Sequence, residues 1–529
     1  MENERSIEYY DSRVRDVKLE DITSSEYNAR ALRKLRDNDP DKSWISFTDD
    51  ANLDVYDVLI RDNDDMGWLG YLIGRNSQLE RLAIYPCLED IDESRIEALF
   101  QGISLNRSIS KLIIFAKWED FYLHHLSNFF RSNKNLTEIT LLTCSDIGLE
   151  TVRNLAVDLR DMSLESFRIA RLCFDSDTYT FTDEGAVTAE VMAALSTHPK
   201  LEHLDLRVCN LDRSACLALG RLSSLKELKI IDSDIDTEGL KALACNFRCL
   251  ESLELSHMSV DIEKEVVALS SGFLSLKKLK LINSIGDDAL QHLVATMAND
   301  TALEVLDLSR NTSITAKGLS SLASLLQSDK CCVRELVLRD MHIGDDGVAA
   351  LAEALAGNKS LQRLDFSDLF SMTAQVEIGI SATGWSAFTR LLCDTSSVNN
   401  TYLSNHTLER CDISHAERME SFDLGYYLSM NKNKNKQHIA MHKILSSHLD
   451  FDLKPLFQWQ LKFLPLIVAW FKTTRAKCPV WIESIDSLQR REISAIYQFV
   501  RGLPMVTVAG WRNLNMTGSE SKKRKLDHL

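Results

Sequence analysis

The sequence lacks the residue clusters that metal, disulfide and nucleotide chemistry require. Its 12 cysteines include no C-x-x-C pair, and its 13 histidines form no cluster at metal-ligand spacing. It contains no G-x-x-x-x-G-K-[ST] loop, no G-x-G-x-x-G, no G-x-S-x-G and no H-E-x-x-H motif. We therefore expect no cofactor, no metal site and no catalytic residue, and we expect the chain not to be an enzyme.

Targeting and membrane-spanning segments are also lacking. The first residues, Met-Glu-Asn-Glu-Arg, are not those of a signal peptide, and the longest apolar run, residues 463–471, is too short to cross a bilayer. Unpaired cysteines of this kind are typical of a reducing compartment. We expect a cytoplasmic and/or nuclear protein that does not bind a membrane.

Positive charge is scarce except at one end. The formal net charge is −16, which disfavours nucleic acid as a partner of the main body. Residues 472–529 hold eleven Lys or Arg against five Asp or Glu, a net charge of +6, so residues 1–471 carry −22. Nucleic-acid binding by this basic end is a third hypothesis, but aromatic residues are sparse there, which argues against it.

The sequence does contain one phrase written many times. Three of its copies are Leu201-Glu-His-Leu204-Asp-Leu206, Leu225-Lys-Glu-Leu228-Lys-Ile230 and Leu303-Glu-Val-Leu306-Asp-Leu308. The central apolar residue of the phrase recurs at Leu82, Leu112, Ile139, Phe167, Leu204, Leu228, Leu253, Leu279, Leu306, Leu336 and Leu364, with a last weak strand at Thr401. Each copy predicts a short strand that buries alternate residues, followed by a helix with apolar residues three and four apart.

This is the leucine-rich-repeat pattern, and residues 51–408 resemble the ribonuclease-inhibitor-like leucine-rich-repeat superfamily. The resemblance implies an α/β fold: a solenoid, or horseshoe, with a parallel concave sheet, convex helices and a helical C-terminal cap. It also implies protein binding as the usual role. The alternative is an activator-type regulator of a small GTPase, with Arg168 or Arg207 orienting the machinery of the GTPase.

The remaining segments complete a four-part organisation. Residues 1–50, charged and without a strand pattern, are expected to form an N-terminal cap with a helix at 24–35. Residues 409–510 are expected to form a helical C-terminal cap with helices at 421–430, 438–447, 461–473 and 484–501, and residues 511–529 a disordered basic tail. Phrases at 430–436, 443–445 and 457–465 are similar to a recurring tail in algal leucine-rich-repeat proteins of unassigned role.

Two steps of 37 residues interrupt the rhythm, after Phe167 and after Leu364. The first extra segment contains Tyr179 and Phe181, and the second contains Phe370 and Trp385. Since all strands run parallel, both insertions should leave the same edge of the sheet, where insertions often mark a binding side. Simple variation in loop length is the alternative.

The residues between the buried leucines should face the concave side. The first strands offer an apolar patch, and later strands offer mixed charges. The candidates are Tyr85, Ile113, Phe115, Leu142, Arg168, Asp205, Arg207, Lys229, Asp307, Arg310, Arg339 and Asp365. We expect a protein partner of unknown identity to be anchored at Tyr85 and Phe115, with charge pairing setting specificity, and we expect the scaffold to be monomeric. A solvated sheet of mixed charge is the competing interpretation.

The basic run Lys522, Lys523, Arg524 and Lys525 has the form of a nuclear import signal. Such a signal acts as a flexible basic peptide that an acidic groove recognises. A plain solubilising terminus is the alternative.

Overall fold

The computed structural model describes residues 7–48, 57–59, 66–85, 93–115, 120–142, 149–171, 174–175, 180–181, 186–235, 237–244, 249–258, 276–297, 302–367, 379–413 and 422–448. The chain forms two compact units, Met1–Met341 and His342–Leu529. Each unit is a stack of strand–helix repeats.

The first unit is built on a parallel sheet whose strands follow one another in space nearly as they do in sequence. The order runs β2-β1-β3-β4-β5-β6-β9-β11-β13-β14-β15-β16. The bounds are β1 Trp44–Thr48, β2 Val58–Leu59, β3 Arg81–Ile84, β4 Lys111–Phe115, β5 Glu138–Leu142, β6 Ser166–Ala170, β9 His203–Arg207, β11 Glu227–Ile231, β13 Ser252–Ser256, β14 Lys278–Ile282, β15 Val305–Asp307 and β16 Glu335–Val337. The predicted solenoid of parallel strands is confirmed.

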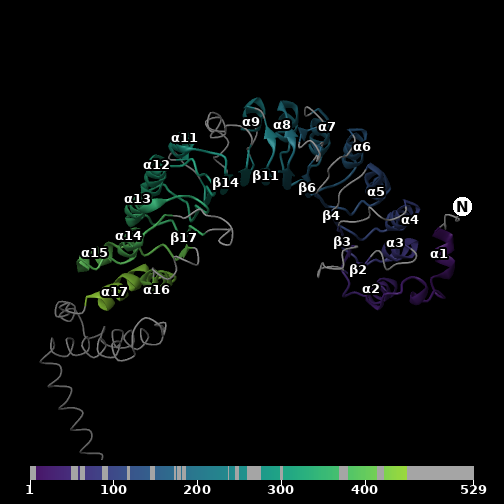
Figure 1. The fold of residues 1–529 in the computed structure, drawn as a ribbon, viewed down its shortest axis with the longest axis horizontal. Coiled ribbons are helices and arrows are strands. Elements are labelled where there is room, and N and C mark those ends of the chain that lie inside the picture. Colours follow the sequence, from purple (N-terminus) through teal and green to yellow (C-terminus); the bar gives the residue numbers. More distant parts are fainter. Residues whose placement is uncertain are drawn as a thin grey trace, which may run out of the picture. The chain divides into compact units, whose positions relative to one another are not determined.

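Helices cover one face of this sheet (Figure 1), and consecutive helices from α2 to α9, as well as α11 and α12, pack against one another. The described helices are α1 Ile7–Arg13, α2 Glu26–Arg36, α3 Met66–Arg75, α4 Glu93–Ile103, α5 Asp120–Ser132, α6 Leu149–Arg160, α7 Ala186–Leu195, α8 Arg213–Leu219, α9 Thr237–Ala244, α11 Asp287–Met297 and α12 Ala316–Gln327, with a 3-10 turn at Leu19–Asp21. The predicted helix at 24–35 is α2.

The core follows directly from the repeated phrase. In β4, Leu112 and Ile114 are buried on the helix side, whereas Ile113 and Phe115 are only half-buried on the other face. The predicted central residues lie opposite one another from strand to strand, as in the pairs Leu82–Leu112 and Leu204–Leu228. The register therefore places all the polar positions of the phrase together on the open face of the sheet.

From β6 to β16 the chain turns sharply after each strand. One residue in each of these turns has a positive φ, at Arg171, Val208, Asp232, His257, Asn283, Arg310 and Asp340. The backbone N–H of this residue donates to a carbonyl of the next repeat, as Val208 does to Ile231 over 2.9 Å. The turn thus connects neighbouring repeats as well as reversing the chain.

Two further devices connect consecutive repeats. The buried side chain of Asn106 donates to the carbonyls of Ile73 and Asn76 in the preceding repeat. Asp287, at the start of α11, caps the next helix, because its Oδ1 accepts from the backbone N–H groups of Thr315 and Gly318 at 2.8 and 2.9 Å. The acidic first turn of α11 is placed to stabilise its own helix through the helix dipole, and it also stabilises the neighbouring helix.

The second unit continues with α13 Gly344–Ala356, β17 Arg363–Asp365, α14 Ala382–Leu392, α15 Val398–Leu403, β18 Arg410–Asp412, α16 Phe422–Asn431 and α17 Lys436–Ser447. Strands β17 and β18 pair in parallel. The helices predicted at 421–430 and 438–447 correspond to α16 and α17, and those predicted at 461–473 and 484–501 lie outside the described residues.

Lys443 of α17 is fully buried in this unit. Its Nζ donates to the carbonyls of Leu392 and Asn405 at 2.5 and 3.0 Å. Burial lowers the pKa of Lys443 to about 7, because the charged form loses its hydration there. The lysine therefore acts as a polar connector between α17 and the preceding repeat.

Three local predictions differ from the structure. Thr401 lies in α15, and the last strand is β18. Strand β1 lies within residues 1–50, where no strand was predicted, with Ile45 and Phe47 fully buried. Trp385 is not part of an insertion loop: it is 2% exposed in α14 and packs with Phe366 and Phe388.

The first insertion forms an antiparallel pair, β7 (Phe174–Asp175) with β8 (Thr180–Phe181), placing the backbone of Phe181 in a small hairpin. Strands β10 (Asn210–Leu211) and β12 (Asp234–Ile235) form a second short parallel pair. Tyr179 and Phe370 lie outside the described residues, as do Lys522, Lys523, Arg524 and Lys525 of the basic tail.

Candidate functional site

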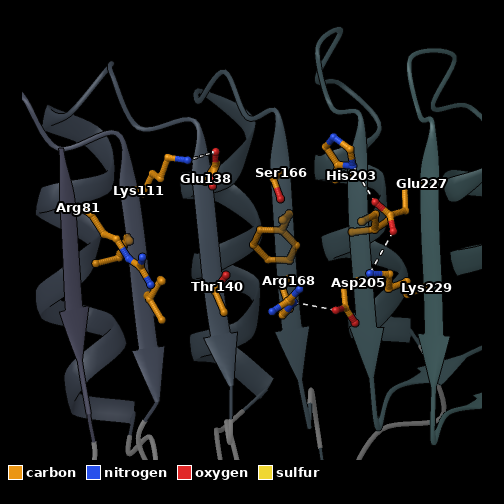
Figure 2. Close-up of a pocket in the computed structure, with 14 residues that line it drawn as sticks. Arg81, Lys111, Glu138, Thr140, Ser166, Arg168, His203, Asp205, Glu227 and Lys229 are labelled. Atoms are coloured by element: carbon orange, nitrogen blue, oxygen red, sulfur yellow. Dashed lines mark hydrogen bonds and ion pairs between the residues drawn. The ribbon is translucent and has the colours of Figure 1, made fainter. Parts of the chain in front are cut away.

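A shallow groove of about 290 Å³ lies on the open face of the first unit, across strands β3 to β11 (Figure 2). Its floor is the backbone and the buried leucine row of the sheet, and its walls are the side chains that alternate with that row. The polar and half-buried lining residues are Arg81, Lys111, Ile113, Glu138, Thr140, Ser166, Arg168, His203, Asp205, Glu227 and Lys229.

Strand register arranges these side chains in two rows. In one row Lys111, Glu138, Ser166 and His203 lie opposite one another on successive strands. In the other row Ile113, Thr140, Arg168 and Asp205 do so. Neighbouring strands are about 4.8 Å apart, so side chains of one row touch across strands.

Paired charges dominate the groove. Nζ of Lys111 lies 2.7 Å from a carboxylate oxygen of Glu138. Glu227 joins two partners, with Nδ1 of His203 and Nζ of Lys229 each at 3.0 Å (Figure 2). Partial burial tends to raise the pKa of Glu227, but the hydrogen bonds from Lys229 and His203 outweigh it, so this pKa lies below its usual value.

The centre of the groove holds one carboxylate between two guanidinium groups. Asp205 is only 5% exposed, and Arg207 donates to it through Nε and Nη2 at 2.9 and 3.0 Å. Nε of Arg168 lies 2.7 Å from Oδ2 of the same carboxylate. The hydrogen bonds of Arg207 to Asp205, with the nearby acids Glu254 and Asp232, raise the pKa of Arg207, so its guanidinium stays charged. Asp205 therefore orients the two arginines and is itself shielded from a partner.

The apolar end begins beside this cluster. The rings of Tyr85 and Phe115 stack with centroids 5.4 Å apart and planes 8° from parallel. Leu142 lies opposite Phe115 in the register, and all three side chains are half-buried. The structure thus brings together the predicted apolar candidates on adjacent repeats.

The other predicted residues are arranged differently. Arg310 pairs with Asp340 at 3.1 Å, Asp307 accepts from Ser309, and Arg339 is half-buried beside them at the far end of the first unit. Asp365 was expected to be available to a partner but is fully buried, and it accepts from Ser367 and Arg363. A carboxylate used in this way holds a turn and cannot meet a partner.

Sequence reasoning missed half of the groove. Arg81, Lys111, Glu138, His203 and Glu227 all precede the central leucine-equivalent of their strands by one position. A period of two places this position on the same face as the residue after the central leucine. The signal was therefore present in the repeated phrase.

No group of three His, Cys, Asp or Glu side chains that could hold a metal ion occurs in the part of the chain that the structure describes. In that same part, none of the helices combines the length and the hydropathy needed to traverse a bilayer.

Comparison with known proteins identifies the repeats. The family model described as Leucine Rich repeat matches residues 221–244, 299–323 and 329–352. Ribonuclease inhibitor of Mus musculus is 30% identical over 193 residues, covering 34% of this chain and 41% of that protein. Ribonuclease inhibitor of Sus scrofa is 29% identical over 265 residues, covering 44% and 57%.

A multidomain relative and a solved structure also match. NACHT, LRR and PYD domains-containing protein 5 of Mus musculus is 27% identical over 302 residues, covering 54% of this chain and 23% of that protein. An internalin of Listeria monocytogenes has 16% identity and a TM-score of 0.32, covering 65% of this chain and 82% of its own.

The chain spans between 23% and 57% of the length of these curated relatives. The resemblance of its C-terminal phrases to an algal family stays a prediction. Strand order, repeat matches and relatives agree on one point: the chain contains leucine-rich repeats and is similar to the ribonuclease inhibitors.

Proposed function

We propose that the chain is a non-catalytic interaction protein that binds a protein partner on the open strand face between β3 and β11. Leucine-rich repeats in general present such extended faces as binding surfaces. The observation that carries the proposal is the stacked Tyr85–Phe115 pair, in which Phe115 lies two residues along β4 from Ile113 of the groove lining. Half-exposed aromatic rings next to oriented charges are typical of the central contacts of protein interfaces.

The ion pairs of the groove support recognition in a second way. Because Lys111–Glu138 and Glu227–Lys229 hold their side chains in fixed positions, a partner meets charges that need little further ordering. Such charges set orientation and reject mismatched partners more than they add affinity.

No specific observation favours the alternative function, regulation of a small GTPase. Such a role would require a polar residue that extends from the surface to the reacting phosphate. Arg168 and Arg207, the two candidates, lie on the strand face with their Nε atoms 2.7 and 2.9 Å from the carboxylate of Asp205.

The test is affinity purification from the native source with a double variant, Tyr85→Asp and Phe115→Asp. Val157→Asp is the matched control, because Val157 is an apolar residue that is 49% exposed on α6, away from the strand face. We expect a set of proteins to be captured by the wild type and by the control and to be lost from the double variant.

Circular dichroism and thermal unfolding of all three proteins establish that the double variant retains the fold. The proposal is wrong if a folded double variant captures the same proteins as the wild type.

A further inference from the structure

We propose that the partner presents an acidic segment carrying an aromatic or branched apolar side chain, laid across strands β3 to β9. This inference rests on the proposed function and adds to it the chemistry of the partner. It follows from an excess of positive charge in the groove of a chain whose net charge is −16.

The first source of that excess is the Arg168–Asp205–Arg207 cluster. Asp205 is the buried member, and Arg207, which holds it through two hydrogen bonds, also lies near the acids Glu254 and Asp232. Arg168 therefore carries the positive charge that is left unbalanced, and its side chain is 39% exposed to the solvent. Nε of Arg168 lies 2.7 Å from the carboxylate without the alignment of a hydrogen bond, and its two terminal nitrogens are not part of this contact. They are available to a carboxylate of a partner.

The second source is Arg81. It is exposed at the β3 end of the groove and forms no ion pair within the described part of the chain. The adjacent Lys111 and Glu138 cancel each other. The groove therefore carries two separate positive positions, one at each end of the patch formed by Ile113 and Thr140.

Two hydroxyl groups border the Arg168 position. Thr140 lies opposite Arg168 on β5, and Ser166 precedes it by two residues on β6, on the same face. Neither hydroxyl has a hydrogen-bond partner among the described residues, so both can donate to an incoming carboxylate. Adjacent strands are about 4.8 Å apart, which allows one carboxylate to reach both Thr140 and Arg168.

The apolar side chain of the proposed ligand is inferred from the apolar residues next to the Arg168 position. Tyr85, Phe115 and Leu142 occupy β3 to β5, next to the strand that carries Arg168. An extended peptide rises about 3.3 Å per residue, so a few residues join the aromatic pair to the arginine. One short segment can therefore bury an apolar side chain on Phe115 and place a carboxylate on Arg168.

Single-stranded nucleic acid would also combine negative charge with stacking, but the groove fits it less well. Glu138, Asp205 and Glu227 interrupt the basic positions, so the even spacing of phosphates would meet repulsion. A peptide can place its few carboxylates only where arginines lie.

The test is selection from a random peptide library on the full chain, with the Tyr85→Asp and Phe115→Asp variant used to remove peptides that bind elsewhere. We expect enrichment of sequences that combine Asp or Glu with an aromatic or branched residue. A fluorescent copy of one enriched peptide then gives affinities for Arg168→Gln and Arg81→Gln, each expected to weaken binding about tenfold. Arg153→Gln is the control: Arg153 is an exposed arginine of α6 that pairs with Glu190, and its removal should leave the affinity unchanged.

Enriched peptides without acidic residues, or affinities unaffected by Arg168→Gln, would overturn the inference. Tighter binding of a single-stranded RNA probe than of any selected peptide would overturn it in favour of nucleic acid. If proteins captured from the native source depend on Tyr85 and Phe115 but the selected peptides are neutral or basic, the proposed function stands and the acidic partner does not. If neither proteins nor peptides depend on the groove, both proposals fall.

Discussion

Helices α3 and α4 touch backbone to backbone, which makes Gly70→Ala a sharp test of how the repeats stack. A β-carbon built on Gly70 would lie 2.2 Å from the carbonyl oxygen of Leu99, and one on Gly102 would lie 2.2 Å from the carbonyl carbon of Gly70. Ordinary carbon–oxygen contacts are about 3.3 Å, so the helices must separate by about 1 Å. The obstacle is backbone, which cannot rotate away.

The expected cost combines two opposing terms. Overpacking a tight contact costs about 1–3 kcal/mol or more, whereas replacing glycine by alanine inside a helix gains about 1 kcal/mol. We expect a net loss of about 2 kcal/mol for Gly70→Ala. The double variant with Gly102→Ala should cost less than the sum of the two, because one displacement relieves both clashes.

Hydrogen exchange of the α3 and α4 peptides measures this loss locally. A loss of about 2 kcal/mol lowers protection roughly 30-fold in these helices. Gly357→Ala is the control, since nothing lies within 4 Å of a β-carbon there, and it should change stability by less than about 0.5 kcal/mol. Unchanged protection in Gly70→Ala, or strict additivity in the double variant, would refute the close packing of these helices.

Four further predictions concern pH, turns, caps and the tail. Burial lowers the pKa of Lys443 from 10.5 to about 7 in the folded state. Between pH 7 and pH 10.5 the lysine is therefore protonated in the unfolded state and mostly neutral in the folded state. The free energy of unfolding consequently rises with pH in this range, by up to about 1.4 kcal/mol per pH unit. Lys443→Met should flatten this slope in unfolding measurements from pH 7 to 9, and an unchanged slope contradicts the assignment. Val208 has a φ of 50°, which a β-branched residue adopts at a cost, so Val208→Asn should raise stability by about 1 kcal/mol in thermal unfolding; a decrease would contradict it. Asp287→Ala should cost about 1 kcal/mol through loss of the cap on α12, whereas Asp288→Ala on the same turn should be nearly neutral, and equal effects would refute the cap. A fluorescent fusion should lose nuclear accumulation on deletion of residues 517–529, and the import signal is wrong if the fusion is cytoplasmic with or without them.

The fold was predictable because one hydrophobic pattern decides it. The central apolar residue from Leu82 to Leu336 is buried in each of these strands, and burial alternates with period two in β4, β5, β11 and β14. The parallel direction of the strands came with the resemblance to known leucine-rich-repeat proteins that the repeated phrase carries.

The errors arose where a polar or unusual residue replaced a leucine. The repeat that contains β18 has the sequence Leu408-Glu-Arg-Cys411-Asp-Ile413, with Cys411 at the central position that leucine occupies in other repeats. Because this position is not a leucine, the last strand was predicted at Thr401 instead. Trp385 was assigned to a loop because it follows a long insertion, but Gly384-Trp385 repeats the Gly347-Val348 start of a buried helix.

The site could be predicted only in part. Period two identified Tyr85 and Phe115 as neighbours on the open face, and their stacking followed from strand register. The sequence could not predict that Asp205 pairs with both Arg168 and Arg207. These arginines lie on different strands, and the repeated phrase does not specify the orientation of their side chains. Buried Asp365 shows the same limit, since its role depends on the turn that follows the strand.

If the protein meets its partner on the open strand face between β3 and β11, a photo-crosslinking amino acid at Thr140, inside the groove, should capture that partner in the native source, whereas one at Val157, on the helical side, should not. We expect a discrete protein adduct from position 140, abolished by Tyr85→Asp with Phe115→Asp, and none of that adduct from position 157. An adduct formed from position 157 alone, or one from position 140 that survives the double variant, would show that the partner binds elsewhere.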